Sequence, residues 1–366
     1  MLEHKEHFHG SDLELIEEKY GISKENITSF SANVNPLGIS SKLRKKLCDN
    51  IDVITSYPDR EYSSLREAIA RYVGSTKRHI AVGNGSTELI SIMMQITKPK
   101  HAILFAPSYS EYEHELECAG GRYEYYELKE ENNFVPDLNE LFKMITDETD
   151  LLIICNPNNP TSYAINNDVM AKILDVCQSH NTIVMVDETY VEFAPDYKHI
   201  SCVALTKIYD NLVILRGISK FFAAPGLRLG YAICSDKELL RKINEKKNPW
   251  TINSLAAIAG EIMFSDEEYI KATKELINKE RQKVTAFLNN IPCLKAYESF
   301  GNFILVRILN DKVSANDLFE TAIRKGLMIR DCSTFQFLDE HYFRFCFMSP
   351  EKNDELLNVI KETFTK

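Results

Sequence analysis

The sequence predicts an α/β fold with two parts. One is a large domain whose mainly parallel sheet is covered by helices, and the other is a smaller α+β domain built from the two chain ends. Short apolar runs and helical patterns alternate through the middle of the chain. The character of this alternation changes after Pro249. The length of 366 residues corresponds to about two domains of roughly 150 residues each.

The expected large domain begins with a helix at residues 63–73, where apolar side chains recur at helical spacing. A strand at 79–82 then leads into the glycine turn Gly83-Asn84-Gly85-Ser86 and an apolar helix. Further strands are expected at 102–106, 122–128, 151–155, 182–187, 212–216 and 230–234. Most of these runs are rich in β-branched residues and too short to form stable helices, and helical patterns separate them. They therefore predict parallel strands.

The segment after Pro249 is expected to form the smaller domain. Residues 256–288 carry an amphipathic pattern that predicts one long helix. Later strands are expected at 303–308, 327–331 and 342–348, with helices at 315–325 and at the chain end. The expected organisation is an N-terminal arm over 1–45 that packs on the small domain, a large domain over 46–255 and the small domain over 256–366.

The composition excludes several classes of protein. The chain has 43 basic and 53 acidic residues and a net charge of −10, so it lacks the basic surface of a nucleic-acid-binding protein. No apolar run approaches the roughly 20 residues of a membrane-spanning helix. The nine cysteines are scattered without a CxxC pair, which favours reduced thiols in a cytoplasmic protein. His4, His7 and His9 have no supporting ligand pattern, so we expect no metal site.

Two motifs at expected strand ends offer a phosphate cradle and a reactive amine. Gly85, Ser86 and Thr87 follow a strand and open a helix, where free N–H groups and hydroxyls can hold a phosphate. A simple capping turn is the alternative, since the third glycine of a dinucleotide fingerprint is absent. Lys220 follows the buried run 212–216, and a desolvated lysine is a good imine former. The alternative for Lys220 is an exposed loop position.

Two further motifs add a carboxylate and an amide. Asp187 ends an expected strand, where it can pair with a ring cation or cap a helix. Asn159 lies in a loop that Pro157 and Pro160 stiffen. Arg228 is a candidate phosphate ligand, or otherwise a surface arginine. One cofactor, pyridoxal 5′-phosphate (PLP), needs a phosphate cradle, an amide, a carboxylate, a lysine and an arginine together.

The sequence resembles the aspartate-aminotransferase-type family of PLP enzymes over essentially its whole length. Within that family it is most similar to the threonine-phosphate decarboxylase branch and next to the histidinol-phosphate aminotransferase branch. The matching segments are FSANVNPLG (30–38), YPDREYSSLREAIARYVG (57–74), GNGSTELI (83–90), APSYSEYE (106–113), NPNNPTS (156–162), VDETYVEF (186–193) and SKFFAAPGLRLGYAI (219–233). The segments that favour the decarboxylase branch are His9-Gly10, NPWTINSLA (248–256) and GLMIRDCSTFQFLDEHYFRF (326–345).

The resemblance implies a role in cofactor binding for each motif. Lys220 would bond PLP covalently and later act as acid and base, and Asp187 would hold the pyridinium proton. Asn159 and Tyr190 would bond the 3′-oxygen of the ring, and Tyr109 would stack on its face. The residues expected to hold the phosphate are Gly85, Ser86, Thr87, Ser219 and Arg228.

The resemblance also implies how the substrate and a second subunit take part. Tyr57 would reach the phosphate in the neighbouring subunit, which makes the active enzyme a homodimer. Arg344 would form a bidentate pair with the α-carboxylate of a small amino-acid substrate. Arg330, Asn33 and His9 would line the substrate end of the site.

Three positions depart from the family pattern. Gly217 replaces a hydroxyl residue three positions before Lys220, which removes one phosphate contact. Ser162 stands where a glycine usually closes the loop after Asn159. Met348 stands where the decarboxylase branch tends to carry an arginine, a few residues after Arg344.

The sequence therefore predicts a PLP-dependent enzyme that acts at Cα of an amino acid. From the resemblance we expect a lyase of cobalamin biosynthesis that decarboxylates L-threonine O-3-phosphate or a similar substrate. An aminotransferase is the alternative. A non-catalytic protein that has kept the scaffold is a third hypothesis, which the intact set of cofactor residues disfavours.

Overall fold

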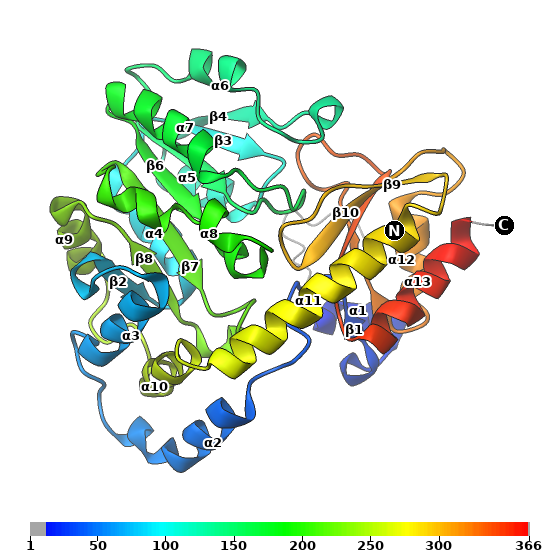
Figure 1. The fold of residues 1–366 in the computed structure, drawn as a ribbon, viewed down its shortest axis with the longest axis horizontal. Coiled ribbons are helices and arrows are strands. Elements are labelled where there is room, and N and C mark those ends of the chain that lie inside the picture. Colours follow the sequence, from blue (N-terminus) through cyan, green and yellow to red (C-terminus); the bar gives the residue numbers. More distant parts are fainter. Residues whose placement is uncertain (1–11, 365–366) are drawn as a thin grey trace.

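The computed structural model describes residues 12–364, which form two units, each built on its own sheet (Figure 1). The larger unit has a seven-stranded sheet in the order β2-β8-β7-β6-β5-β3-β4. Its strands are β2 (Ile80–Gly83), β3 (His101–Ala106), β4 (Arg122–Glu127), β5 (Leu151–Cys155), β6 (Ile183–Asp187), β7 (Leu212–Gly217) and β8 (Gly230–Ile233). The strands expected for the large domain are therefore confirmed, whereas the single strand expected at 327–331 is divided into two short strands of different sheets.

The expected mainly parallel sheet is also confirmed, with β8 as the exception. This strand runs antiparallel to both of its neighbours, β2 and β7. A connection between parallel strands usually contains an α-helix that crosses the sheet. The connection between β7 and β8 contains only the short 3₁₀ helix at Pro225–Leu227, so the chain returns antiparallel.

Helices cover the larger sheet, and alternate strand residues pack into two core clusters. In β5, Leu152 and Ile154 belong to one cluster, while Leu151 and Ile153 belong to the other. The first cluster includes residues of α3 (Ser63–Val73), α7 (Asn167–Ser179) and α10 (Ser254–Met263). The second includes residues of α4 (Gly85–Thr97), α5 (Glu111–Cys118) and α9 (Lys237–Lys246). The remaining helices of this unit are α2 (Ser41–Asp49), α6 (Leu138–Met144) and α8 (Tyr197–Ile200).

The smaller unit combines both ends of the described chain. Its antiparallel sheet has the order β12-β13-β10-β9. The strands are β9 (Leu294–Ala296), β10 (Phe303–Ile308), β12 (Arg330–Asp331) and β13 (Tyr342–Cys346), and the helices are α1 (Leu13–Tyr20), α12 (Ala315–Ile323) and α13 (Pro350–Phe364). The early strand β1 (Thr28–Ser29) pairs with β11 (Leu327–Met328), which ties the N-terminal segment to this unit.

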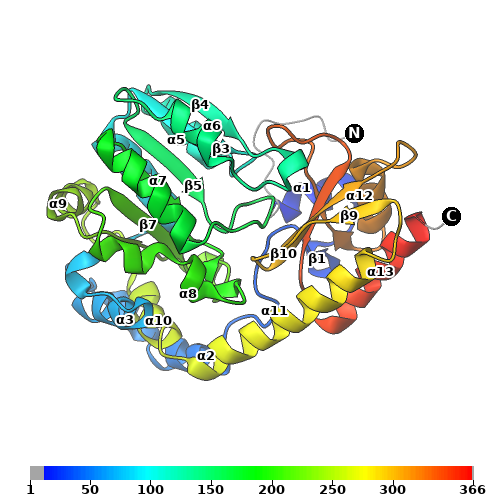
Figure 2. The same cartoon turned by 45° about the horizontal axis from the view of Figure 1, so that its top comes forward.

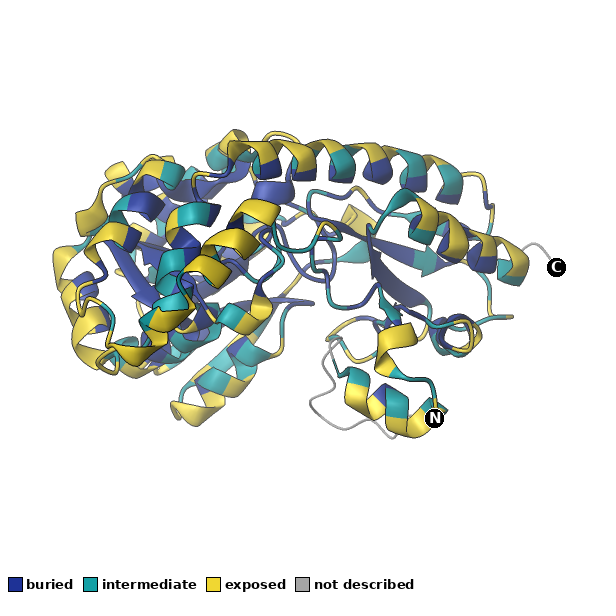
Figure 3. Cartoon of the chain, turned by 90° about the horizontal axis from the view of Figure 1, so that it is seen from below, coloured by how far each residue is buried: buried dark blue, intermediate teal, exposed yellow. Residues whose placement is uncertain are grey.

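Helix α11 (Glu267–Leu288) runs from the larger unit to the smaller one (Figures 1 and 2). One face of it is buried and the opposite face is exposed (Figure 3). The prediction of one helix over 256–288 was wrong, because α10 ends at Met263 and α11 begins at Glu267. Asp266 caps α11 by accepting a hydrogen bond from the Tyr269 N–H, and it also accepts one from Ser40. An N-cap aspartate favours a helix start over a helix interior, a local signal that the amphipathic pattern hides.

A second connection between the units is centred on Glu130, which follows β4. Its carboxylate accepts hydrogen bonds from Lys295 Nζ at 2.5 Å and Tyr297 OH at 2.7 Å. Arg307 Nη1 lies 3.0 Å from the other carboxylate oxygen. We call these four residues the Glu130 cluster, in which one unit supplies the acid and the other supplies the three donors.

The N-terminal segment contacts more than one part of the molecule. After β1 pairs with the smaller unit, the chain continues to α2, which packs on α10 (Figure 1). The domain boundaries expected from the sequence remain a prediction. Within residues 12–364, none of the helices combines the length and the apolar character that a membrane span requires.

Candidate active site

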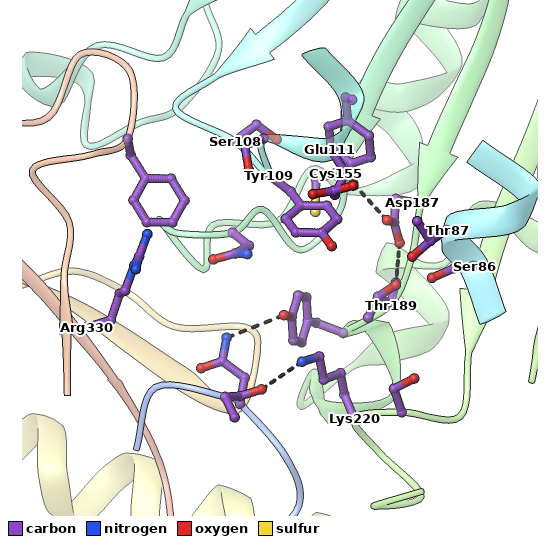
Figure 4. Close-up of a pocket in the computed structure, with 18 of the residues that line it drawn as sticks. Ser86, Thr87, Ser108, Tyr109, Glu111, Cys155, Asp187, Thr189, Lys220 and Arg330 are labelled. Atoms are coloured by element: carbon purple, nitrogen blue, oxygen red, sulfur yellow. Dashed lines mark hydrogen bonds between the residues drawn. The ribbon is translucent and has the colours of Figure 1, made fainter. Parts of the chain in front are cut away.

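A pocket of 710 Å³ lies where the carboxyl ends of the parallel strands face the smaller unit. Tyr109 follows β3, Asn159 follows β5, Asp187 ends β6 and Lys220 follows β7. In Figure 4, Arg330 enters this pocket from the smaller unit. Ligands of open α/β sheets bind beyond the carboxyl ends of the strands, and the pocket occupies that position.

Most residues singled out in the sequence line this pocket. They are Asn33, Ser86, Thr87, Tyr109, Asn159, Asp187, Tyr190, Ser219, Lys220, Arg228, Arg330 and Arg344. Gly85 lies just behind the lining, at the start of α4 beside Arg228. Tyr57 lies elsewhere, on the surface, with 80% of its side chain exposed. His9 lies outside the described residues.

The start of α4 forms a tight cradle. Gly85 has a φ of +80°, and a Cβ atom there would lie 2.6 Å from Nη2 of Arg228. A Cβ atom on Gly230 of β8 would lie 2.4 Å from the backbone of Gly85. Glycine at both positions therefore allows the guanidinium and strand β8 to approach the helix start. With the hydroxyls of Ser86 and Thr87 in the first turn, this end of α4 is suited to an anion.

Asp187 is buried at the end of β6, and its carboxylate has three donors. Oδ1 accepts from the N–H and the hydroxyl of Thr189, at 2.9 and 2.5 Å, and Oδ2 accepts from Tyr112 OH at 2.7 Å (Figure 4). Burial raises the pKa of Asp187, while the bonds from Thr189 and Tyr112 act in the opposite direction. A buried carboxylate held in this way favours a cationic partner in the pocket. Sequence reasoning missed Thr189 and Tyr112, although both lie inside the quoted motifs.

Lys220 extends into the pocket, and its Nζ donates a hydrogen bond to the carbonyl of Ala32 at 2.7 Å. Burial lowers the pKa of Lys220 to about 8, and the positive charge of Arg344 contributes in the same direction. Near pH 8, Lys220 is therefore a neutral amine in a substantial fraction of the protein molecules. The neutral amine is the form that attacks a carbonyl carbon.

Four buried polar atoms of residues that line the pocket have no hydrogen-bond partner among residues 12–364. They are Ser31 Oγ, Asn33 Oδ1, Ser108 Oγ and Arg344 Nε. The Asn33 amide donates to Tyr190 OH at 3.4 Å. Unsatisfied buried polar groups are costly unless a ligand or water completes their bonding. Ser31 and Ser108 were not identified from the sequence, because a serine in a loop carries no distinguishing pattern.

Two arginines lie together at the smaller unit's side of the pocket. Arg330 of β12 and Arg344 of β13 are direct cross-strand neighbours. Arg344 is 4% exposed and donates to the neutral oxygens Asn159 Oδ1 and Ser31 O, and within the described part of the chain it forms no salt bridge. The ring of Phe335 lies 5.3 Å from the Arg330 guanidinium and 6.0 Å from that of Arg344. Like charges directly opposite each other destabilise a strand pair, and the neutral partners of Arg344 leave its charge uncompensated within residues 12–364, so the Arg344 side of the pocket is suited to an anion.

Burial lowers the pKa of Arg330 to about 10, and the charge of Arg344 contributes to the lowering. The nearby carboxylates of Asp331 and Asp12 act in the opposite direction. Arg330 also donates to the hydroxyl of Thr334 at 2.9 Å, which orients its guanidinium.

The three departures from the family pattern have distinct surroundings. A Cβ atom on Gly217 would lie 3.6 Å from Ser86 Oγ, so a small side chain fits there. Ser162 adopts a left-handed φ of 61°, and its hydroxyl accepts from the Gly301 N–H at 2.9 Å, a bond that glycine could not form. Met348 is not among the residues that line the pocket; it packs against the core, and its N–H donates to Asn353.

Comparison with known proteins identifies the family. Residues 25–360 match the model of the family "Aminotransferase class I and II". The threonine-phosphate decarboxylase of Salmonella typhimurium is 31% identical over 98% of this chain and 96% of its own length. The histidinol-phosphate aminotransferase of Methanosphaera stadtmanae is 30% identical over 98% of this chain and 96% of its own length.

Among solved structures, the histidinol-phosphate aminotransferase of Clostridium acetobutylicum matches with a TM-score of 0.86 at 32% identity, and the match covers 92% of this chain and 98% of that one. The cofactor of this class is PLP. The glycine cradle, the buried carboxylate of Asp187 and the low pKa of Lys220 fit its phosphate, its ring nitrogen and its aldehyde. The chain therefore belongs to the class I and II aminotransferase family of PLP-dependent enzymes.

Proposed function

We propose that this PLP-dependent enzyme removes the α-carboxylate of a phosphorylated amino acid, with L-threonine O-3-phosphate as its substrate. The observation that carries the proposal is the direct pairing of Arg330 with Arg344 in a buried end of the pocket. A substrate with both a carboxylate and a phosphate would place one anion against Arg344, whose hydrogen-bond partners among residues 12–364 are neutral oxygens, and a second anion beside Arg330. The likeness to the threonine-phosphate decarboxylase of Salmonella typhimurium supports the same substrate.

The cofactor is assigned to the residues around the cradle. Its phosphate is assigned to the start of α4, and its ring is assigned to the space between Tyr109 and Lys220. The residues assigned to the phosphate are Gly85, Ser86, Thr87, Ser219 and Arg228, those assigned to the 3′-oxygen are Asn159 and Tyr190, and Asp187 is assigned to the ring nitrogen. Bound PLP supplies an electron sink for the charge that remains at Cα when one of its bonds breaks.

The protein's own side chains orient the substrate and transfer the protons of the proposed reaction. The hydrogen bonds from Thr189 and Tyr112 favour the charged form of Asp187, which would hold a proton on the ring nitrogen of bound PLP. Arg344 binds the carboxylate, and its bonds to Asn159 and Ser31 fix the orientation of the guanidinium. After the carboxylate has left as CO₂, the protonated amine of Lys220 delivers a proton to Cα.

An aminotransferase is the second candidate. In that reaction the neutral amine of Lys220, which its low pKa makes available, removes the proton from Cα while Arg344 retains the carboxylate. The likeness to the histidinol-phosphate aminotransferase structure of Clostridium acetobutylicum favours this alternative.

We also propose that the active form is a homodimer, in which Tyr57 enters the pocket of the second copy and binds the cofactor phosphate. The exposure of Tyr57 and its absence from the lining of its own subunit's main pocket support this arrangement. Tyr57 borders a surface cavity of 330 Å³. The same stretch of chain exposes Ile51 and Ile54, so the surface around Tyr57 has apolar area to bury.

One incubation tests the proposed reaction. The purified PLP-loaded protein is mixed with O-phospho-L-threonine in the absence of a keto acid, and CO₂ is measured. Steady release over many turnovers is the expected result. Conversion of the bound cofactor to its amine form after a single turnover, with no CO₂, would identify an aminotransferase instead. L-threonine is the matched control, because equal CO₂ release from it would refute recognition of the phosphate.

A further inference from the structure

Tyr57 and Trp250 form an exposed aromatic pair on the surface of the larger unit. Tyr57 lies between the 3₁₀ helix at Ile51–Thr55 and α3, and Trp250 lies between α9 and α10. Their ring centroids are 4.7 Å apart, with 37° between the planes. The Tyr57 side chain is 80% exposed and that of Trp250, the single tryptophan of the chain, is 42% exposed. Two large rings therefore meet where neither is covered by the body of the protein.

The backbone of Trp250 is held in an unusual conformation. Its φ is 54°, in the left-handed region that bulky residues rarely adopt. Such a conformation persists where the surroundings fix it, and it is common at functional positions. The surroundings here are hydrogen bonds from the following residues to the chain on either side of Tyr57. Ile252 bonds to Tyr62 OH through both its N–H and its carbonyl, and Ser254 Oγ donates to the carbonyl of Ser56 at 3.1 Å.

The same short segment contacts the cradle of its own subunit. Thr251 Oγ1 donates to Glu88 in the first turns of α4 at 2.5 Å, and Asn253 donates to the carbonyl of Leu227, next to Arg228. Residues 251–254 thus connect the anion cradle of this subunit with the stretch of chain that carries Tyr57. Trp250 stands at the Tyr57 end of this connection.

We propose that Trp250 is a positioning residue, whose ring holds the side chain of Tyr57 in the orientation in which it enters the pocket of a second copy. This inference rests on the homodimer proposed above. A tyrosine that extends into solvent samples several rotamers, and binding then requires it to lose that freedom. The ring of Trp250 restricts Tyr57 beforehand. Arg60, whose guanidinium lies 5.9 Å from the centre of the Trp250 ring, supports the tryptophan in turn.

The test measures PLP affinity instead of turnover. Apoprotein variants are titrated with PLP, and the dissociation constant is read from the visible absorbance of the bound cofactor. Trp250→Ala is expected to weaken PLP binding about fivefold through lost pre-organisation, and Tyr57→Phe about tenfold or more through a lost phosphate contact. Trp250→Phe keeps an aromatic ring and is expected to bind PLP as the wild type does. Ile208→Ala removes a different exposed apolar side chain and serves as the matched control.

A mixed dimer distinguishes two effects that Trp250→Ala could have. The variant could misplace the Tyr57 that enters the other subunit's pocket, or it could disturb the anion cradle of its own subunit. One subunit carries Lys220→Ala with intact Tyr57 and Trp250, and the other carries Trp250→Ala with intact Lys220. Borohydride reduction then fixes cofactor only in the Trp250→Ala subunit, because only that subunit has Lys220. The pocket of that subunit receives Tyr57 from the Lys220→Ala subunit, in which Trp250 is intact. We expect wild-type affinity in that pocket. Affinity as weak as in the Trp250→Ala homodimer would mean that the variant acts through Thr251 and Glu88, which overturns the inference.

The possible outcomes distinguish the role of Trp250 from the homodimer proposal on which it rests. A wild-type chain that sediments as a monomer while binding PLP, with Tyr57→Phe unchanged, would overturn the dimer and the inference together. A dimer in which Tyr57→Phe weakens binding but Trp250→Ala does not would overturn the role of Trp250 alone. If Trp250→Ala fails to fold, Trp250→Leu, which keeps an apolar side chain but removes the ring, replaces it with the same expectations.

Discussion

Lys220 Nζ donates a hydrogen bond to the backbone carbonyl of Ala32, at 2.7 Å, across 188 residues of sequence. The residues on either side of Ala32 make equivalent contacts. The Ser31 carbonyl accepts from Arg344, and the Asn33 amide donates to Tyr190. Three consecutive residues of the N-terminal segment therefore set the resting positions of side chains from both units of the molecule.

The rate at which the apoprotein bonds PLP is expected to rise with pH, with a midpoint at about 8. Burial lowers the pKa of Lys220 to this value, so its amine is protonated below the midpoint and neutral above it. Only the neutral amine attacks an aldehyde. Stopped-flow absorbance between pH 6 and pH 10 measures the profile. A rate that continues to rise beyond pH 9 would contradict a lowered pKa for this lysine.

Replacing Arg344 is expected to weaken substrate binding and leave cofactor binding unchanged. Arg344→Lys keeps the charge but removes the two-pronged geometry, and a lost charge-assisted hydrogen bond corresponds to about a 10- to 100-fold increase in the substrate dissociation constant. Spectral titration of the PLP-loaded variant with O-phospho-L-threonine measures it. Arg324→Lys, at an exposed position of the same unit, is the control. Unchanged substrate affinity would disprove the assigned role of Arg344.

Gly217→Ser is expected to tighten PLP binding by about 3- to 10-fold, the effect of one additional hydrogen bond to a phosphate. The position has room, because a Cβ atom would lie at ordinary contact distance from Leu229 O and Ser86 Oγ. Gly217→Ala adds the Cβ atom without the hydroxyl and is the matched control. Equal affinities for the two variants would indicate that no phosphate oxygen lies within reach of this position.

The buried cluster of Arg216, Glu188 and Glu192 predicts a pH dependence of stability. Arg216 bonds Glu188 at 2.7 Å but lies 3.7 Å from Glu192, and burial raises the pKa of Glu192 to about 7. The folded chain therefore keeps a proton on Glu192 that the unfolded chain releases at lower pH. This contribution to stability is present below about pH 4.5 and is lost as the pH rises to 7, by at most about 3 kcal/mol at 1.36 kcal/mol per pKa unit.

Glu192→Gln removes this titration, because glutamine resembles the protonated acid at every pH. The free energy of unfolding in urea is expected to be similar for wild type and variant at pH 5, and higher for the variant at pH 8. Glu127→Gln, at an exposed position at the end of β4, is expected to change neither value. A variant that is less stable than the wild type at pH 8 would show that Arg216 needs the charge of Glu192.

The sequence was sufficient to predict most of the pocket, because its motifs lie at strand ends and parallel strands bring their ends together. It was not sufficient to predict the pairing of Arg330 with Arg344, since the register of β12 against β13 depends on the intervening loop. The contact of Lys220 with Ala32 was also inaccessible, because a backbone carbonyl has no side-chain signature. The helix break before Glu267 was missed because an amphipathic pattern continues across a cap.

The Glu130 cluster has a consequence for the contact between the two units. One carboxylate faces Lys295, Arg307 and Tyr297 across the junction of the two units, so any movement that separates the units on this side separates a negative charge from two positive ones. These side chains are partly exposed, and dissolved ions reach and screen them. Ionic strength therefore acts on this contact between the units, and added salt is expected to weaken the attraction within the Glu130 cluster.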